Sequence, residues 1–478
     1  DNDSENFEFL WYFGDGNESN IANPIHTYNI EDDHLYNVIL KVTDQNGYIG
    51  YATIPVELEF GNSTLPLSIN FIGDVMIGRN YDSNSGIINQ YGVNYIFEHT
   101  LSELGDNADI TVANLECPLT TSTDAHPTKS VVFKARPENV SGLVYAGIDI
   151  VSLANNHTID YGTEGLINTQ NILDENNILH SGAGMNSTEA YEPLYLNSNG
   201  LNIAFLASCD RTGQYNNYQP YLHAGYNKPG FAYMTPYYIQ QQIQDAEDYS
   251  DFIILELHAG SEYSTSPGAD YDQIILDNVE TNNYLLPNQI IDMVDQFDIS
   301  DEEEDYNLFL DVPHMWDREI RHFAIDNGAD MVIIHHPHII QGIEVYNNKV
   351  IAHSLGNFIF DLSYPETFPS MILETKLDTS GFYDYSVIPI YIDDYIPYRP
   401  TGKLAMHILN YIAAKSRELD TYVYTDNINE TAHVIMDTTF FNTTNVVNRK
   451  NIDFFESDNN WLSIPIPIHN NGNFVSID

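Results

Sequence analysis

Positively charged side chains are scarce in this sequence. Its 478 residues hold 17 Lys and Arg against 69 Asp and Glu, which gives a formal net charge of −52. A chain this acidic repels nucleic acids and anionic membranes, so most proteins that bind a phosphate backbone are excluded. The same charge repels a polyanionic substrate, and we therefore expect the few cations near a binding site to matter.

Cysteine is rarer still, because Cys117 and Cys209 are the only two. Cys117 directly follows Glu116, and Cys209 ends the apolar run IAFLASC. One pair of cysteines allows three states. In the order in which we rank them, these are a disulfide, two buried thiols and a thiol beside a metal site.

Three further patterns are missing. No apolar run reaches the ~18 residues that would span a membrane. The sequence has neither a Gly-x-Ser-x-Gly nor a Gly-x-x-x-x-Gly-Lys motif, which leaves little support for a serine hydrolase or a P-loop protein. A signal peptide is not visible either, and the first residue is Asp1, so we expect a processed chain or part of a longer one.

Six short polar segments stand at the ends of apolar runs that are typical of buried strands. They are Gly73-Asp74, Asn114-Leu115-Glu116, Asn155-Asn156-His157, His258, His335-His336-Pro337-His338 and Ser354-Leu355-Gly356-Asn357. Helical patterns lie between the runs, which predicts an α/β fold with crossover connections. Because ligands collect beyond the carboxyl ends of strands in such sheets, the six segments predict one shared site.

The residue types in these segments indicate a metal site. Carboxylates, carboxamide oxygens and imidazoles are the ligands that hold Mn, Fe, Zn or Mg. A pair of such ions orients a nucleophilic water and neutralises charge that develops on a phosphoryl group. A carboxylate such as Glu116 can bridge the two ions.

These segments carry a family resemblance that runs from about Leu67 to Pro389. The chain resembles the CapA family of capsule-synthesis, or poly-γ-glutamate, proteins, which belongs with the calcineurin-like metallophosphoesterases. The resemblance implies a four-layer αββα sandwich, in which helices flank two packed sheets. The matching stretches are FIGDVMIGR (71–79), ANLECPLT (113–120), VSLANNHTIDYG (151–162), HAGSEY (258–263), GADMVIIHHPHIIQGIEVY (328–346) and IAHSLGNFIFD (351–361).

The resemblance also implies roles for particular residues, and one or two divalent ions as cofactors. The implied metal ligands are Asp74, Glu116, Asn156, His258, His336 and His338. His157 is implied as the acid that protonates the leaving group. Asp160, three residues later, either holds the His157 ring in one tautomer and raises its pKa, or begins a helix. Both interpretations stay open.

Met76 departs from the pattern of the wider superfamily, which has Asp-x-His on the first strand where this chain has Asp74-Val75-Met76. Methionine is a soft, weak ligand for hard ions. One metal subsite is therefore expected to be short of a ligand, or to be completed by water or a neighbouring side chain. Occupation by a single ion is an open alternative.

Three residues are candidate substrate contacts. Arg79 follows Asp74 by five residues and either holds an anionic substrate group or forms a salt bridge to a carboxylate at the sheet edge. Asn114 and Asn357 stand at strand ends beside the proposed ligands and supply hydrogen-bonding amides.

The chain divides into four predicted regions. Residues 1–60 resemble part of a PKD domain, an all-β immunoglobulin-like module of extracellular proteins, on the motifs WYFGDGNES, NPIHTY and YNVILKVTDQNG. Residues 61–66 form a linker, 67–400 the CapA-like domain, and 401–478 a helical and β-rich accessory region. An insertion at about 265–313 carries an acidic run at 301–305, which is either a solvated loop or a loop that binds cations or gates substrate.

The functional expectation is an extracellular or cell-surface CapA-type protein that takes part in surface polymer synthesis and carries a metal-dependent hydrolase site. The expected substrate is an anionic surface polymer or a phosphoester, and assembly partners at the cell surface are left open. The alternatives are a component that binds or exports the polymer without cleaving it, or an adhesion protein. A fold alone does not decide between them.

Overall fold

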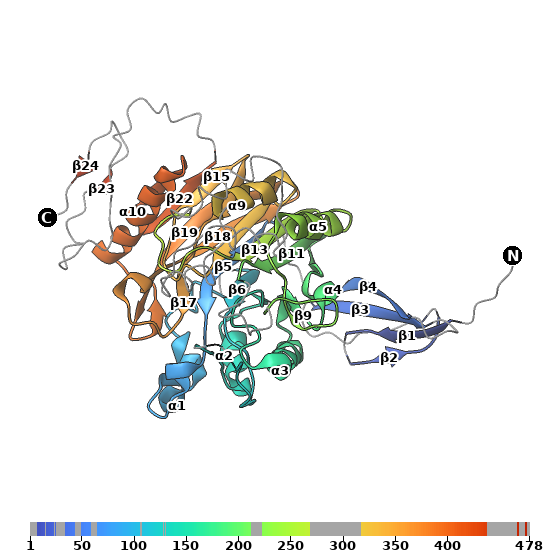
Figure 1. Cartoon of the computed structure of the whole chain (residues 1–478). Coiled ribbons are helices and arrows are strands. Elements are labelled where there is room, and N and C mark those ends of the chain that lie inside the picture. The colour runs from blue at the N-terminus through green and yellow to red at the C-terminus, as the bar shows by residue number, and fades with distance from the viewer. Residues whose placement is uncertain are drawn as a thin grey trace, which may run out of the picture.

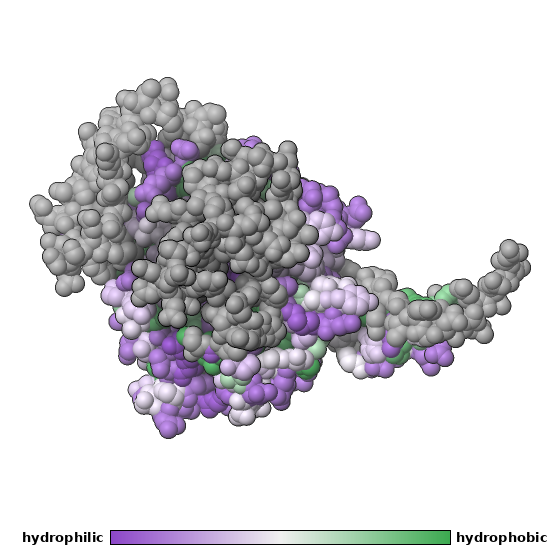
Figure 2. Space-filling view, viewed as in Figure 1, coloured by the Kyte–Doolittle hydropathy of each residue, from purple (hydrophilic) through white to green (hydrophobic). Residues whose placement is uncertain are grey.

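The structure is a computed structural model, and it describes residues 7–14, 16–22, 24, 34–43, 49–58, 65–105, 108–127, 129, 131–211, 222–267, 317–436, 466–467 and 474–475. Nearly all of the predicted insertion, with its acidic run, lies outside these residues. Within the described ranges, no helix is long and apolar enough to cross a membrane. The described part of the surface seen in Figure 2 is mostly hydrophilic.

The N-terminal region holds a four-stranded antiparallel sheet in the order β2-β1-β3-β4. Its strands are β1 (Glu8–Tyr12), β2 (Glu18–Ser19), β3 (His34–Thr43) and β4 (Ile49–Leu58). The predicted strands of this region are therefore present, and β4 contacts β10 of the following domain. The PKD-like assignment stays a prediction.

Two mixed sheets form the core of the described part of the chain after residue 65 (Figure 1). The larger has the order β21-β22-β19-β18-β5-β6-β7-β8, with β17 on β5 and β20 on β19. Its strands are β5 (Leu67–Val75), β6 (Ile110–Leu115), β7 (Ile150–Ser152), β8 (Leu179–Ser181), β17 (Asn357–Ile359), β18 (Pro369–Asp378), β19 (Gly381–Asp393), β20 (Ile396–Tyr398), β21 (Tyr422–Asp426) and β22 (Thr431–Ile435). The described residues after 400 thus extend this sheet.

The smaller sheet has the order β10-β11-β13-β14-β16-β15. Its strands are β10 (Leu194–Ser198), β11 (Leu201–Cys209), β13 (Phe252–His258), β14 (Met331–His335), β15 (Ile343–Tyr346) and β16 (Lys349–Ala352). Short pairs form outside both sheets, and they are β9 (Ala183–Gly184) with β12 (Gly230–Phe231), and β23 (Ile466–Pro467) with β24 (Phe474–Val475).

The inner faces of the two sheets pack against each other. Ile69 on β5 and Val112 on β6 belong to the same buried apolar cluster as Phe205 on β11 and Ile333 on β14. Each of these side chains is less than 2% exposed. Burial of this kind contributes about 1.5 to 3 kcal/mol for each large apolar side chain, so the contact between the sheets is a main source of stability.

Helices cover the outer faces of the sheets and form the crossovers between strands (Figure 1). The longer ones are α2 (Val140–Tyr145) and α3 (Gly162–Glu175) on the larger sheet, α5 (Pro236–Glu247) and α9 (Asp317–Asp326) on the smaller sheet, and α10 (Lys403–Glu418) beside β15 and β21. The short ones are α1 (Ile87–Tyr91), α4 (Ser187–Ala190), and the 3-10 turns η1 (Arg79–Asp82), η2 (Val93–Ile96), η3 (Pro137–Asn139) and η4 (Pro365–Thr367). The predicted α/β class is confirmed.

Parallel pairing brings the predicted segments to one edge of each sheet. In the larger sheet, β5, β6 and β7 are parallel, and Asp74 pairs with Asn114. In the smaller sheet, β11, β13 and β14 are parallel, and His258 pairs with both Cys209 and His335. The carboxyl ends of both sets of strands therefore supply the site.

The two cysteines do not form the disulfide that the sequence analysis ranks first. Cys117 and Cys209 are separate buried thiols, each no more than 2% exposed. Burial raises the pKa of both thiols. They fill space in the core, where a thiol acts as a small apolar group.

Candidate metal centre

Asp74 lies at the floor of the site because β5 and β17 approach closely there. Asn357 pairs with Asp74, and the Asp74 N–H donates to Gly356 O at 3.1 Å. A Cβ added at Gly73 would overlap the Gly356 carbonyl oxygen, so only glycine fits at that position. This close approach places the side chain of Asn357 beside His338, whose Nδ1 lies 2.9 Å from Asn357 Oδ1.

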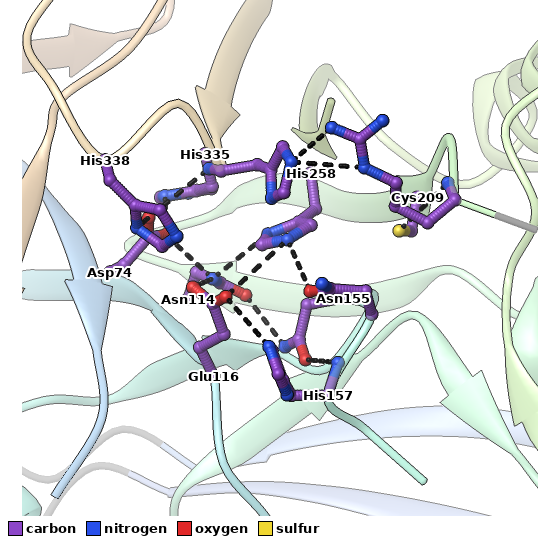
Figure 3. Close-up of polar contacts among 12 residues, drawn as sticks. Asp74, Asn114, Glu116, Asn155, His157, Cys209, His258, His335 and His338 are labelled. Carbon is purple, nitrogen blue, oxygen red and sulfur yellow. Dashed lines mark hydrogen bonds and ion pairs between the residues drawn. The ribbon is translucent and has the colours of Figure 1, made fainter. Parts of the chain in front are cut away.

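Asn114 lies beneath the carboxylates and is fully buried. Its amide nitrogen donates to Asp74 Oδ1 at 2.8 Å and lies 3.3 Å from His258 Nδ1, while its oxygen accepts from Asn155 Nδ2 at 3.0 Å. Figure 3 shows this amide at the centre of the polar contacts. These contacts favour a role in orienting ligands, and the predicted contact with substrate stays a prediction for Asn114 and for Asn357.

The histidine segment 335–338 has an unusual backbone. His336 has φ = 96° and His338 has φ = 59°. Positive φ is uncommon for residues other than glycine and costs of order 1 to 3 kcal/mol each, so the surrounding structure must hold it in place. The His336 N–H donates to Asp74 Oδ2 at 3.3 Å, and this bond fixes the segment over the carboxylate.

The predicted ligands form two overlapping groups. Glu116, His258 and His336 each offer one ligand atom, and these atoms lie within 4.8 Å of one another. Asp74, Glu116 and His338 do the same. Glu116 belongs to both groups, as a bridging carboxylate must. Asn156 joins the first group, because its Oδ1 lies 3.0 Å from His258 Nε2.

Two buried atoms in these groups lack a hydrogen bond to any described residue. They are Glu116 Oε1 and His336 Nδ1. An unsatisfied buried polar atom costs about 1 to 3 kcal/mol. Glu116 Oε1 also lies 3.9 Å from His258 Nε2, which leaves room for an ion to contact both atoms. The residues present therefore fit a divalent cation.

In the metal-free site the histidines have the ionisation that metal binding requires, whereas Glu116 would have to give up a proton to an incoming ion. Burial raises the pKa of Glu116 well above its ordinary value, and the Asp74 charge adds to the rise. Burial would also raise the pKa of Asp74, but contacts with His335 and His338 hold it well below its usual range. Burial lowers the pKa of His258 and His336, so both rings are neutral and able to bind metal.

His157 is held by two neighbours. Its Nδ1 lies 2.6 Å from Asp160 Oδ2, and its ring stacks on Phe133 with centroids 3.6 Å apart. Its Nε2 faces Glu116 Oε1 at 4.0 Å. The structure thus places Asp160 against the ring. Burial, the largest effect, lowers the pKa of His157 to about 4, while Asp160 acts to raise it, as expected, and is outweighed.

Lys129 completes this arrangement, and sequence reasoning missed it. Its side chain is 1% exposed and forms an ion pair with Asp160. Its Nζ also donates to Asn156 O at 2.6 Å. Lys129 lies in the loop before Phe133 and is distant in sequence from any strand end. No local sequence pattern therefore connects it with the site.

Arg79 forms the internal salt bridge that the sequence analysis left open. Its Nε lies 3.4 Å from Asp361 Oδ2, and its guanidinium lies over the Phe133 ring at 4.9 Å. The side chain remains 34% exposed. Its position behind Phe133 and His157 leaves it near the site, and a contact with substrate stays a prediction.

Three more residues adjoin the ligands. Arg211 Nε donates to His336 Nε2 at 3.1 Å, and His335 Nδ1 lies 3.3 Å from Asp74 Oδ1. Glu262 offers a carboxylate oxygen within 4.8 Å of ring nitrogens of His336 and His338. The sequence signal that could have identified these residues is their proximity to the strand-end motifs. All three, Arg211, His335 and Glu262, follow or lie within such motifs.

Comparison with known proteins identifies the family. A family model described as "Bacterial capsule synthesis protein PGA_cap" matches residues 68–278 and 309–362, which is more than half of the chain. The chain belongs to this family of bacterial capsule synthesis proteins. The match includes every predicted ligand.

Two relatives extend over most of the chain. The capsule biosynthesis protein CapA of Bacillus anthracis is 27% identical over 345 residues, which cover 71% of this chain and 70% of the relative. The PGA biosynthesis protein CapA of Bacillus subtilis (strain 168) is 27% identical over 333 residues, which cover 69% of this chain and 73% of the relative.

Solved structures give weaker matches. A hypothetical protein from Thermus thermophilus aligns with a TM-score of 0.35 and 14% identity, covering 68% of this chain and 98% of that protein. A phosphatase from Mycoplasma pneumoniae aligns with a TM-score of 0.36 and 12% identity, covering 69% of this chain and 95% of that protein. The family assignment rests on the sequence matches.

Proposed function

We propose that this chain is an extracellular or cell-surface protein of the CapA type, which acts in the synthesis of a surface polymer such as poly-γ-glutamate. We further propose that it carries a metal-dependent, phosphoesterase-like hydrolase site. One observation carries the second part: two groups of carboxylate and imidazole ligands share Glu116, and His157 faces that carboxylate at 4.0 Å. The family and the names of its relatives support the first part.

The fold belongs to the same proposal. Two sheets pack face to face, and helices cover both outer faces, which supports a four-layer metallophosphoesterase-like sandwich. The N-terminal sheet is proposed to be part of a PKD-like module that acts as a spacer. PKD-like modules are typical of extracellular proteins. The role of the N-terminal sheet is to hold the catalytic domain away from its attachment point.

Two ion sites are proposed on the basis of the two ligand groups. One ion would be held by Glu116, Asn156, His258 and His336, and the other by Asp74, Glu116 and His338. When bound, such ions supply Lewis acidity and a water of lowered pKa for attack on a phosphoryl or acyl group. Asn114 keeps the ligands oriented from below, because its amide contacts Asp74 and His258 at once.

His157 is the group proposed to move a proton at the leaving-group oxygen. Asp160 fixes Nδ1, and the stack on Phe133 fixes the ring plane, so Nε2 is the atom that faces the site. With a pKa of about 4, the ring is neutral near pH 7. It must therefore take up a proton within the site before it gives one to the leaving group.

The substrate is proposed to be an anionic polymer or a phosphoester. Arg79 is the candidate that meets its negative charge from the solvent side, since its side chain is 34% exposed and its contact with Asp361 is long at 3.4 Å. An anionic group of the substrate would bind the exposed part of the guanidinium and leave that contact in place, because Asp361 is itself buried and would lose its cation if the pair were broken.

The test compares the parent chain with two single variants. Turnover of phosphomonoesters, phosphodiesters and γ-glutamyl peptides is measured after loading with Mn²⁺, Fe²⁺ or Zn²⁺. His157→Ala is expected to lower kcat by about 100-fold or more, because positioned proton transfer contributes that much. His99→Ala, which removes an exposed histidine, is the matched control and should leave the rate unchanged.

Metal content is measured on the same samples and on His336→Ala. The parent should retain metal after dialysis, and His336→Ala should lose it. Equal metal content in the two proteins would show that the site is not a metal centre. If the parent binds metal but cleaves none of these substrates, the hydrolase proposal fails for them and the alternative of a non-catalytic polymer-binding component is favoured.

A further inference from the structure

Met76 leaves the first strand with only one ligand. Its side chain is fully buried within the apolar cluster on the outer face of the larger sheet. Its sulfur already accepts the Gly78 N–H at 3.3 Å. A thioether is in any case a poor ligand for hard ions. The ion site formed by Asp74, Glu116 and His338 therefore lacks the first-strand imidazole of the superfamily pattern.

Glu262 lies beside the imidazole of that ion site. One of its carboxylate oxygens is within 4.8 Å of a ring nitrogen of both His336 and His338. His338 is also the imidazole of the site that lacks a ligand. Glu116 is fully buried whereas Glu262 is exposed, so the two carboxylates reach the histidines from the inner and the solvent side.

The turn that carries Glu262 is fixed by backbone contacts. The Tyr263 N–H donates to Pro337 O at 2.9 Å, and the Ala259 N–H donates to His335 O at 3.0 Å. Tyr263 adopts φ = 62°, a left-handed conformation that is uncommon for an aromatic residue. These two bonds join the turn to the histidine segment at His335 and at Pro337, so the main chain sets the position of Glu262.

We propose that Glu262 is the ligand that takes the place of the imidazole missing at Met76. This inference rests on the proposed metal centre and specifies its composition. One ion is held by Glu116, Asn156, His258 and His336, and the other by Asp74, Glu116, His338 and Glu262. The second set has three carboxylates and one imidazole, so it favours a hard ion such as Mn²⁺ or Mg²⁺. The first set has two imidazoles and suits Zn²⁺ or Fe²⁺.

The cost of using an exposed carboxylate is small. Glu262 is a surface residue in the free protein, so its charge is hydrated and needs no buried partner. Binding an ion then orders one side chain, whose turn is already held by the Pro337 contact. The Glu262 site is expected to bind its ion more weakly than the first site and to exchange it faster.

The test counts ions on the full chain after removal of metal and titration with Mn²⁺. Ion content is measured by elemental analysis, and electron paramagnetic resonance reports whether two Mn²⁺ ions are coupled through a shared carboxylate. The parent should bind two coupled ions. Glu262→Gln should keep one ion and weaken the second by at least tenfold, a typical loss for a disrupted metal site.

Glu366→Gln is the matched control. Glu366 is a partly exposed glutamate whose charge, like that of Glu262, acts on Tyr263, but it belongs to none of the ligand groups. It should bind two ions like the parent. A second variant, Glu262→His, restores an imidazole and should again bind two ions, with the second site now favouring Zn²⁺.

The outcomes separate this inference from the proposed function. If Glu262→Gln binds two coupled ions as tightly as the parent, Glu262 is not a ligand. One ion in the parent would also overturn the Glu262 assignment, while the metal centre itself would stand. No ion in the parent would overturn both. Circular dichroism of the metal-free proteins confirms that each variant is folded.

Discussion

Replacing Lys129 by methionine tests whether the cation behind His157 holds that part of the site together. Lys129 is 1% exposed and its Nζ pairs with Asp160, itself fully buried. The same nitrogen donates to Asn156 O, on the residue before His157, at 2.6 Å. Methionine keeps most of the side-chain volume and removes only the charge and the donors, so the change leaves no large cavity.

The size of the loss in stability depends on the hydrogen-bond donors that Asp160 keeps after the substitution. Loss of one partner from a buried ion pair costs about 3 to 5 kcal/mol. Asp160 keeps two donors after the substitution, since the Phe133 N–H lies 2.5 Å and His157 Nδ1 lies 2.6 Å from its Oδ2. We therefore expect the lower end, a loss of about 3 kcal/mol in the free energy of unfolding.

Urea denaturation followed by circular dichroism measures this loss, in a cycle with Asp160→Asn and the double variant. In the double variant, the neutral amide that replaces Asp160 no longer needs a cation. The double variant's loss in free energy of unfolding should therefore be smaller than the sum of the two single losses by at least about 1.5 kcal/mol. Lys376→Met is the control: its pair with Asp384 is exposed and should contribute below about 1 kcal/mol. A loss below about 1 kcal/mol for Lys129→Met, or strict additivity in the cycle, would refute the reasoning.

Three further changes test the fold around the site. Gly73→Ala should prevent β17 from pairing with β5 and lower the thermal midpoint by several degrees, because its Cβ would overlap Gly356 O; an unchanged midpoint would contradict the close approach. Glu344→Gln should cost about 3 kcal/mol in urea, since this buried carboxylate accepts bonds from α9 and from His353 at 2.8 Å. Burial raises the pKa of Glu256 to about 7, so this group should contribute a loss of up to about 3 kcal/mol of stability in the metal-free parent as pH rises from 4.5 to 7. Glu256→Gln should make the slope shallower by that share, while the raised pKa values of Asp149 and Asp210 leave a remainder.

The ends of the strands could be predicted from sequence because each depends on a local pattern. An apolar run followed by Asp74, Asn114 or His258 indicates a buried strand and its carboxyl end, and parallel pairing then brings such ends together. The structure places β5, β6, β13 and β14 as expected, with their ends at the site. The resemblance to CapA proteins added the assignment of individual ligands, and family membership is now shown.

Features that depend on tertiary contacts could not be predicted in this way. Lys129 reaches Asp160 through a loop with no strand or helix pattern, so nothing in the sequence marks it. The pKa of His157 was expected to rise with Asp160 nearby, but burial beneath Phe133 outweighs that charge. The thiols of Cys117 and Cys209 both lie near strand ends, yet strand ends that share one site need not bring two sulfurs into bonding distance.

The strongly negative charge of the chain poses a question about how an anionic substrate reaches the site. Among the described residues, two cations beside the ligands are buried and paired: Lys129 with Asp160, and Arg211 with Asp210 at 3.5 Å. Their charge is therefore largely neutralised before any substrate binds. We therefore expect the attraction to come from metal ions and from Arg79, whose side chain is 34% exposed although its partner Asp361 is buried. Because exposed charges are screened beyond about 8 Å at physiological salt, repulsion by the distant acidic surface is weak there and local cations decide the outcome.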